Sequence, residues 1–182
     1  MKNISMLFAL ILSFVISTNV YAQGATPTNS VVVVDIKKII NESSATKSIQ
    51  KQIEEKRKAI QTEIGKQEEN LRKTDKDLAE QRTVLSKEAF DKKLSEFKTN
   101  VAEAQRNVQN KRNQLEKAYA ESLAEVEKVV VSIVSELSDK KGFSVAIPKA
   151  NALFSKNSLD ISDEVLKMLD ERLPKVKVKL EN

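Results

Sequence analysis

The chain has 182 residues, of which 31% are charged and 4% aromatic, and its formal net charge is +5. It contains no histidine and no cysteine, which excludes a Ser–His–Asp triad, histidine metal ligands, a thiolate nucleophile and disulfides. The composition is typical of long charged helices with a small core, and it predicts no enzyme, no metal site and no cofactor.

The N-terminus has the layout of a secretory signal peptide. Lys2 precedes an uncharged stretch that begins at Ile4, and Val20-Tyr21-Ala22 is a small-x-small pattern of the kind that signal peptidase cleaves. We therefore expect residues 1–22 to be a signal peptide that is removed near Ala22. An uncleaved membrane anchor is the alternative, although several Ser, Thr and Asn residues dilute the apolar stretch.

Residues 23–43 are expected to form the first part of a small body. The β-branched run from Val31 to Val34 predicts a strand over residues 31–36. A polar stretch follows, where Ser43 or Ser44 is expected to cap a helix. From there to Lys141 the chain has no proline and one glycine, Gly65, so a continuous helical region is predicted.

Residues 126–182 are expected to complete the body. The helical region ends at Gly142, and Phe143 to Ile147 alternates like a strand. Short extended pieces are expected at 152–154 and 159–161. Ser162 is then expected to cap a helix that ends before Pro174, and the tail at 176–180 is predicted to be a strand or to fray.

The helical region between these parts, residues 44–125, carries a break in its apolar repeat. The spacing is three or four residues along most of the region, but the step from Leu85 to Phe90 is five. Ser86 suits an N-cap, and Leu85 and Phe90 would form a hydrophobic staple across it. We therefore predict an antiparallel hairpin with its tip near residues 83–90; one continuous rod is the alternative.

The helix at the end of the second arm is apolar around more than one stripe. Such a helix is buried on several sides, and the body of one chain is small. We therefore predict an oligomer interface there, with packing on the chain's own sheet as the alternative. The predicted interface residues are Val126, Val130, Ile133, Val134 and Leu137.

Together these predictions give a mostly α fold with a small α+β body. A long antiparallel helical hairpin projects from the body like a tentacle, and the body assembles as an oligomer. The sequence segments VVVVD, LSKEAF, KKGFSVAIPKANALF and LDISDEVLKMLDERL fall at the matching places. In this layout the chain resembles the Skp/OmpH family of periplasmic chaperones over nearly all of its mature length.

The resemblance implies a periplasmic homotrimer that holds unfolded outer-membrane proteins in a cavity between its arms without ATP. An anionic membrane surface is a further expected partner, because the net charge is positive, and nucleic acid is not expected. A structural coiled-coil adaptor of the cell envelope is the alternative function. The expected client-binding residues, which also suit the seam between the two arms, are Leu71, Leu78, Leu85, Phe90 and Phe97.

Overall fold

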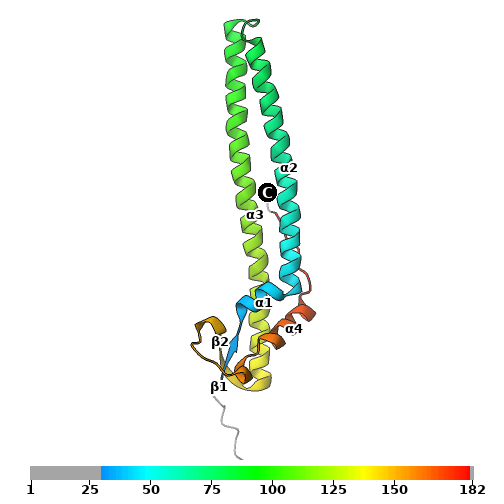
Figure 1. Ribbon diagram of the computed structural model, residues 1–182, viewed down its shortest axis with the longest axis vertical. Helices are drawn as coiled ribbons and strands as arrows, with labels where there is room; N and C mark the ends of the chain where they lie inside the picture. The colour runs from blue at the N-terminus through cyan, green and yellow to red at the C-terminus, as the bar shows by residue number, and fades with distance from the viewer. Residues whose placement is uncertain (1–29, 181–182) are drawn as a thin grey trace, which may run out of the picture.

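The computed structural model describes residues 30–180 and confirms the predicted fold class. Two long antiparallel helices, α2 (Ser44–Gln81) and α3 (Lys87–Lys141), rise from a small body (Figure 1). The body contains strands β1 (Ser30–Val34) and β2 (Phe143–Pro148) and helices α1 (Ile36–Glu42) and α4 (Ser162–Arg172). The predicted signal peptide lies outside the described residues. None of the helices in residues 30–180 is apolar over a length that would cross a bilayer.

The reversal between the arms occurs where the five-residue step predicted it. The N-cap of α3 is Ser86, with φ −61° and ψ 154°, and its hydroxyl accepts the Ala89 N–H at 3.3 Å. Phe90 N–H bonds the Ser86 carbonyl at 2.9 Å and begins the regular helix. The structure therefore excludes one continuous rod.

The start of the body differs from the prediction. β1 ends at Val34 instead of residue 36, because Asp35 caps the short helix α1, which the sequence analysis missed. The Asp35 carboxylate accepts the Lys38 N–H at 2.9 Å. At the next boundary Ser43, and not Ser44, caps α2, and its hydroxyl bonds both the N–H and the hydroxyl of Thr46.

The two strands form a parallel pair in which the whole hairpin is the crossover connection. Val31 lies opposite Val145, and Val34 lies opposite Pro148. Gly142 ends α3 with φ 74°, a left-handed conformation that glycine adopts without strain. The chain thus turns directly from the end of α3 into β2.

The segment between β2 and α4 has more helical character than expected. Two short 3-10 turns lie here, η1 (Lys149–Asn151) and η2 (Asn157–Leu159). The extended piece expected at 152–154 has no regular secondary structure, and η2 includes the first residue of the piece expected at 159–161. Only an isolated bridge joins Asp160 to Val33. Ser162 is not the N-cap of α4: Ile161 takes that position, because the Ser162 hydroxyl is engaged elsewhere, by the Asp35 N–H at 2.7 Å.

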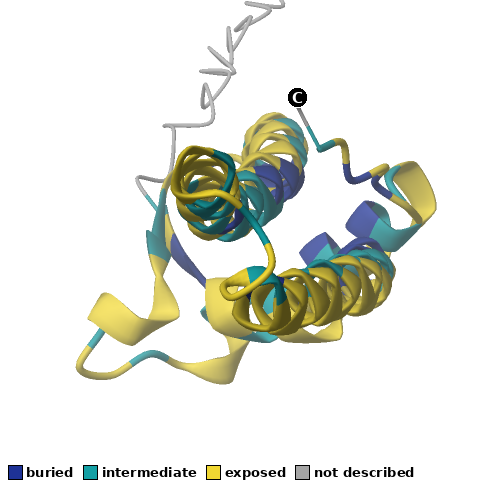
Figure 2. Cartoon of the chain, turned by 90° about the horizontal axis from the view of Figure 1, so that it is seen from above, coloured by how far each residue is buried: buried dark blue, intermediate teal, exposed yellow. Residues whose placement is uncertain are grey.

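The core lies at the base of α3, enclosed by segments from both ends of the chain. Seen from above in Figure 2, exposed residues cover most of both arms, and buried residues lie on segments that face the interior. The core is built from apolar side chains of the sheet, of all four α-helices and of the tail. Its largest fully buried members are Ile39, Ile49, Val126, Ile133, Leu137, Val165 and Leu169.

This burial corrects the predicted oligomer interface. Val126, Val130, Ile133 and Leu137 are each less than 5% exposed within the single chain. They therefore pack against the chain's own elements and present almost no surface to a second copy. Val134, the fifth predicted residue, is half-buried and keeps exposed surface.

The tail neither pairs as a strand nor frays. Residues 174–180 have no regular secondary structure, yet Val176 and Val178 are 2% and 3% exposed and belong to the core. The tail is therefore an ordered part of the body.

Candidate binding surfaces of the arms and the body

Of the five apolar arm residues singled out in the sequence, Leu71 and Leu78 lie on α2, Phe90 and Phe97 lie on α3, and Leu85 lies in the turn between the two helices. Leu78 is 7% exposed, whereas Leu71, Leu85, Phe90 and Phe97 are half-buried. In a two-helix hairpin the opposite arm supplies this shielding. Their role in the seam is thus consistent with the structure, and binding of a client by their exposed portions stays a prediction.

Two neighbouring hollows lie on the lower half of the arms, nearer the body than those residues. One has a volume of about 760 Å³ and an apolar floor that includes Ile60, Ile64 and Val108. The other has a volume of about 390 Å³ and includes Ile53 and Tyr119. Both share Arg57, Leu115 and Glu116 in their lining. We call this pair of hollows the arm trough: an apolar floor with charged side chains at its rim.

Gly65 lines the trough and is itself exposed. A Cβ atom added at Gly65 would meet no heavy atom within 4 Å, so the space beside the glycine is open. Lys111 also lines the trough and pairs across the arms with Glu63 at 2.9 Å. The sequence analysis did not identify this site. Two signals pointed to it: the single glycine of the helical run, and Lys111, a charged residue at an apolar position of the repeat.

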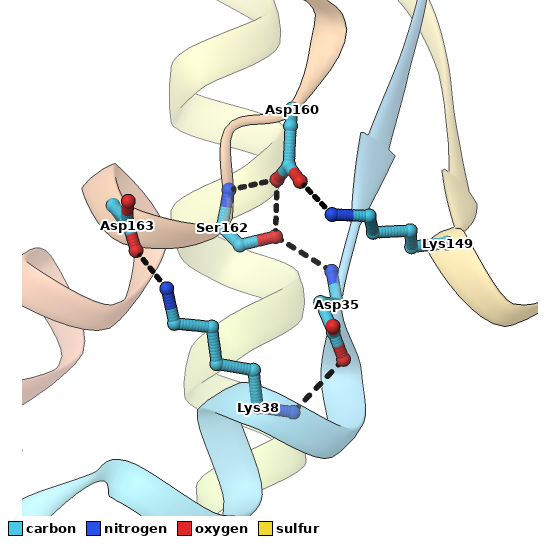
Figure 3. A network of polar contacts seen from close by, with 6 residues as sticks. All are labelled: Asp35, Lys38, Lys149, Asp160, Ser162 and Asp163. Carbon is cyan, nitrogen blue, oxygen red and sulfur yellow. Dashed lines mark hydrogen bonds and ion pairs between the residues drawn. The ribbon is translucent and has the colours of Figure 1, made fainter. Parts of the chain in front are cut away.

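A polar network ties the two chain ends together in the body (Figure 3). The Ser162 hydroxyl accepts the Asp35 N–H at 2.7 Å and donates to the Asp160 carboxylate at 2.5 Å. That carboxylate also accepts the Ser162 N–H at 3.0 Å and the Lys149 ammonium at 2.6 Å. The network therefore joins the junction of β1 and α1 to the start of α4 and to the segment after β2.

The charges of the network shift the acid–base behaviour of its members. Burial by itself would raise the pKa of Asp160, but hydrogen bonds from Lys149 and Ser162 outweigh it and lower that pKa to about 2. The same bond raises the pKa of Lys149, and a 2.5 Å ion pair with Asp163 raises the pKa of Lys38. These groups stay charged near neutral pH, so the network acts as a structural clamp and not as a general acid or base.

The sheet side of the body carries an exposed apolar hollow of about 250 Å³. Its lining includes Ile36 and Val131, which are 36% and 68% exposed, and the half-buried Val134. Val31 and Val145 of the sheet are 42% and 47% exposed. Of the interface predicted from the sequence, the part around Val134 is thus the part that keeps accessible apolar surface.

Comparison with known proteins agrees with this architecture. A family model described as "Outer membrane protein (OmpH-like)" matches residues 30–169. A solved structure of an OmpH-like protein from Caulobacter crescentus CB15, described as a candidate outer membrane chaperone, superposes with a TM-score of 0.77 at 16% identity, covering 84% of this chain and 90% of that one. No curated protein sequence matches the chain. The family match spans well over half of the chain, and its hairpin-on-body fold is the one described above, so this protein belongs to the OmpH-like family.

Proposed function

We propose that this protein is an ATP-independent holdase chaperone of the periplasm. In this role it binds unfolded outer-membrane proteins between its arms and prevents their aggregation before membrane insertion. The arm trough is the observation that carries the proposal, because it offers an apolar floor with charged rims on an otherwise polar hairpin.

The chemistry of the trough suits this class of client. Strands of outer-membrane barrels alternate apolar and polar residues, so an unfolded one presents only short apolar contacts separated by polar groups. A shallow apolar floor bordered by charged residues such as Arg57, Lys111 and Glu116 can meet both kinds of residue. Many weak contacts of this kind favour retention and release of a client without a chemical energy source.

Trimer formation is part of the proposal, and it places the arms of three chains around one cavity. The exposed apolar hollow beside Ile36, Val131 and Val134 supports it, since contiguous apolar surface of this sort marks interaction sites. The edge strand β2 in a two-stranded parallel sheet supports it as well, because parallel sheets are usually covered and extended.

The N-terminal sequence supports the proposed location. A signal peptide over residues 1–22, cleaved near Ala22, would deliver the chain to the periplasm. A net charge of +5 also favours contact with an anionic membrane surface, where outer-membrane clients emerge. A coiled-coil adaptor remains the second candidate, favoured by the length of the hairpin alone.

Aggregation of an unfolded porin tests the proposal directly. Residues 23–182 should suppress light scattering of a porin diluted from urea, without ATP, at one trimer per client. A Gly65→Trp variant fills the trough and should weaken suppression several-fold. A Lys66→Trp variant adds the same side chain at an exposed neighbouring position and should act like the parent protein.

Each result has a separate meaning. If the parent protein leaves scattering unchanged, the holdase proposal is wrong and the adaptor is favoured. If the parent suppresses scattering and Gly65→Trp does so equally well, the client binds outside the trough, and the seam residues near the tip become the better candidates.

A further inference from the structure

The C-terminal tail returns along the lower part of α2 as an extended chain (Figure 1). Val176 and Val178 point into the core, whereas Lys175, Lys177 and Lys179 are exposed. This alternation is that of a β-strand with one buried face. The tail thus has the side-chain pattern of a strand, although no backbone strand lies beside it among the described residues.

The side chain of Gln52 takes the place of that missing strand. Its amide nitrogen donates to the Val176 carbonyl at 2.6 Å, and its amide oxygen accepts the Val178 N–H at 3.1 Å. A single residue in a parallel sheet makes the same pair of bonds through its own N–H and carbonyl, to the residues on either side of the one opposite. Gln52 is held in this position by Ser48, whose hydroxyl and carbonyl accept from the same nitrogen.

The opposite edge of the tail is open. In an extended chain the backbone groups of successive residues point to opposite edges, so those of Lys177 point away from Gln52. No described residue bonds the Lys177 N–H or carbonyl. An ordered segment with one paired edge and one open edge is a template for adding a further strand.

The tail carries a strongly positive charge on its exposed face, which Lys175, Lys177 and Lys179 supply, and more positive charge lies across its paired edge. A groove of about 690 Å³ between the tail and the start of α2 is lined by Lys47, Lys51, Lys175 and Lys177, with Glu55 as its one carboxylate. None of these four lysines forms an ion pair with a residue in 30–180. In contrast, Lys38 and Lys149 of the polar network each hold a carboxylate.

We propose that this edge, which we call the lysine edge, binds an extended acidic segment of another polypeptide. The segment adds as a strand to the backbone at Lys177, and its carboxylates pair with the exposed lysines of the tail itself, Lys175, Lys177 and Lys179. Successive exposed lysines of the tail are about 7 Å apart, twice the rise per residue of a strand, which matches acidic side chains at every second residue of the added segment.

The backbone geometry favours a peptide over a phosphate-bearing lipid or a free phosphate. All three would satisfy the lysines, but only an extended polypeptide presents an N–H and a carbonyl at the spacing of a neighbouring strand, as the open backbone groups of Lys177 require. The inference concerns a surface separate from the arm trough, and it holds for any protein that supplies such a segment.

Fluorescence anisotropy with a defined probe tests the lysine edge. The probe is a fluorescein-labelled nine-residue peptide of alternating Glu and Thr, titrated with residues 23–182 at low salt. A Lys175→Gln/Lys177→Gln variant should bind it about tenfold more weakly, as expected for the loss of two ion pairs. The matched control, Lys92→Gln/Lys98→Gln, removes two exposed charges from α3 and should leave binding unchanged.

A second peptide separates strand addition from simple charge attraction. The same sequence with alternate backbone nitrogens methylated keeps its charge but loses the N–H donors of one strand edge, and it should bind several-fold more weakly than the parent peptide. Equal binding of the two peptides would overturn strand addition. An equal loss in both lysine variants would overturn the assignment to this edge.

Competition addresses the other anions. Phosphatidylglycerol vesicles and inorganic phosphate should displace the probe only at concentrations far above that at which the unlabelled peptide displaces it. Displacement at low concentration that depends on Lys175 and Lys177 would identify a phosphate site and overturn the assignment to a peptide.

Discussion

The body and the arms of this protein are stabilised in different ways. In the body, segments from both ends of the chain enclose the base of α3, and side chains such as Ile39, Ile133 and Leu169 are completely buried. Between residues 61 and 110, by contrast, Leu78 and Ala104 are the only buried side chains. The body therefore depends on burial, whereas the upper arms depend on their helices.

Local interactions account for much of the helical order in the arms. Ion pairs one turn apart, such as Lys73 with Glu69 at 3.3 Å and Lys76 with Glu80 at 3.9 Å, contribute about 0.3 kcal/mol each. Such pairs support each helix separately and do little to fix one arm against the other. A rigid base with compliant arms suits the proposed function as a holdase.

A charge placed in the body should have the largest effect. Ile133 has no exposed surface, so Ile133→Asp buries an unpaired carboxylate and should cost about 4 kcal/mol or more. We expect loss of the cooperative unfolding transition measured by circular dichroism. A variant that stays folded but has a different oligomer mass in native mass spectrometry would instead place Ile133 in an interface between copies. That result would contradict the conclusion that the body is stabilised by burial within one chain.

Proline in the arms should have an effect that depends on position. Lys92→Pro falls inside α3 and should cost about 3 kcal/mol or more, since it removes a helix hydrogen bond. Lys87→Pro falls on the first residue of α3, after Ser86 with ψ 154°, and should be tolerated. Urea unfolding followed by circular dichroism measures both; similar costs at the two positions would contradict a turn at Ser86.

The polar network should give the body a modest dependence on acid. The pKa of Asp160 is about 2 in the folded chain and 3.8 as its reference value, so its carboxylate stabilises the fold above pH 3.8 and loses this effect as the pH falls towards 2. Because Lys149 is partly exposed, the contribution should be about 1 kcal/mol.

Urea midpoints of the parent chain and Asp160→Asn at pH 6 and pH 2 test this expectation. The parent should be more stable at pH 6, and the difference should shrink at pH 2. A difference that does not change with pH would show that Asp160 acts through its shape alone. The arms lack this network, so the circular dichroism signal of their helices should depend less on pH than the stability of the body does.

The hairpin was predictable because its signals are local. The five-residue step from Leu85 to Phe90 and the cap at Ser86 lie within one turn of each other, and the structure places the reversal there. Gly142 was predictable for the same reason. Helix α1 was missed because the strand predicted from the valine run was extended through Asp35. In the structure the carboxylate of Asp35 caps α1, and the strand ends before it.

The errors concern contacts between distant residues. The apolar pattern of α3 correctly indicated burial on several sides, but it did not specify which segments cover Val126 and Ile133, and these segments come from the chain itself. Ser162 has the local pattern of a cap, yet its hydroxyl is engaged by Asp35. The pairing of Gln52 with the tail has no local signal, and the arm trough depends on how the two arms face each other.

The parallel pairing of β1 with β2 also has a consequence for the order of folding. Asp35 and Ser162 are 127 positions apart, so the body forms only after a very long loop has closed. The hairpin needs contacts near its tip only, and its closure brings the two strands towards each other. During synthesis β1 can therefore pair only after β2 has been made near the end of the chain. The helices of the arms are expected to form before the body does.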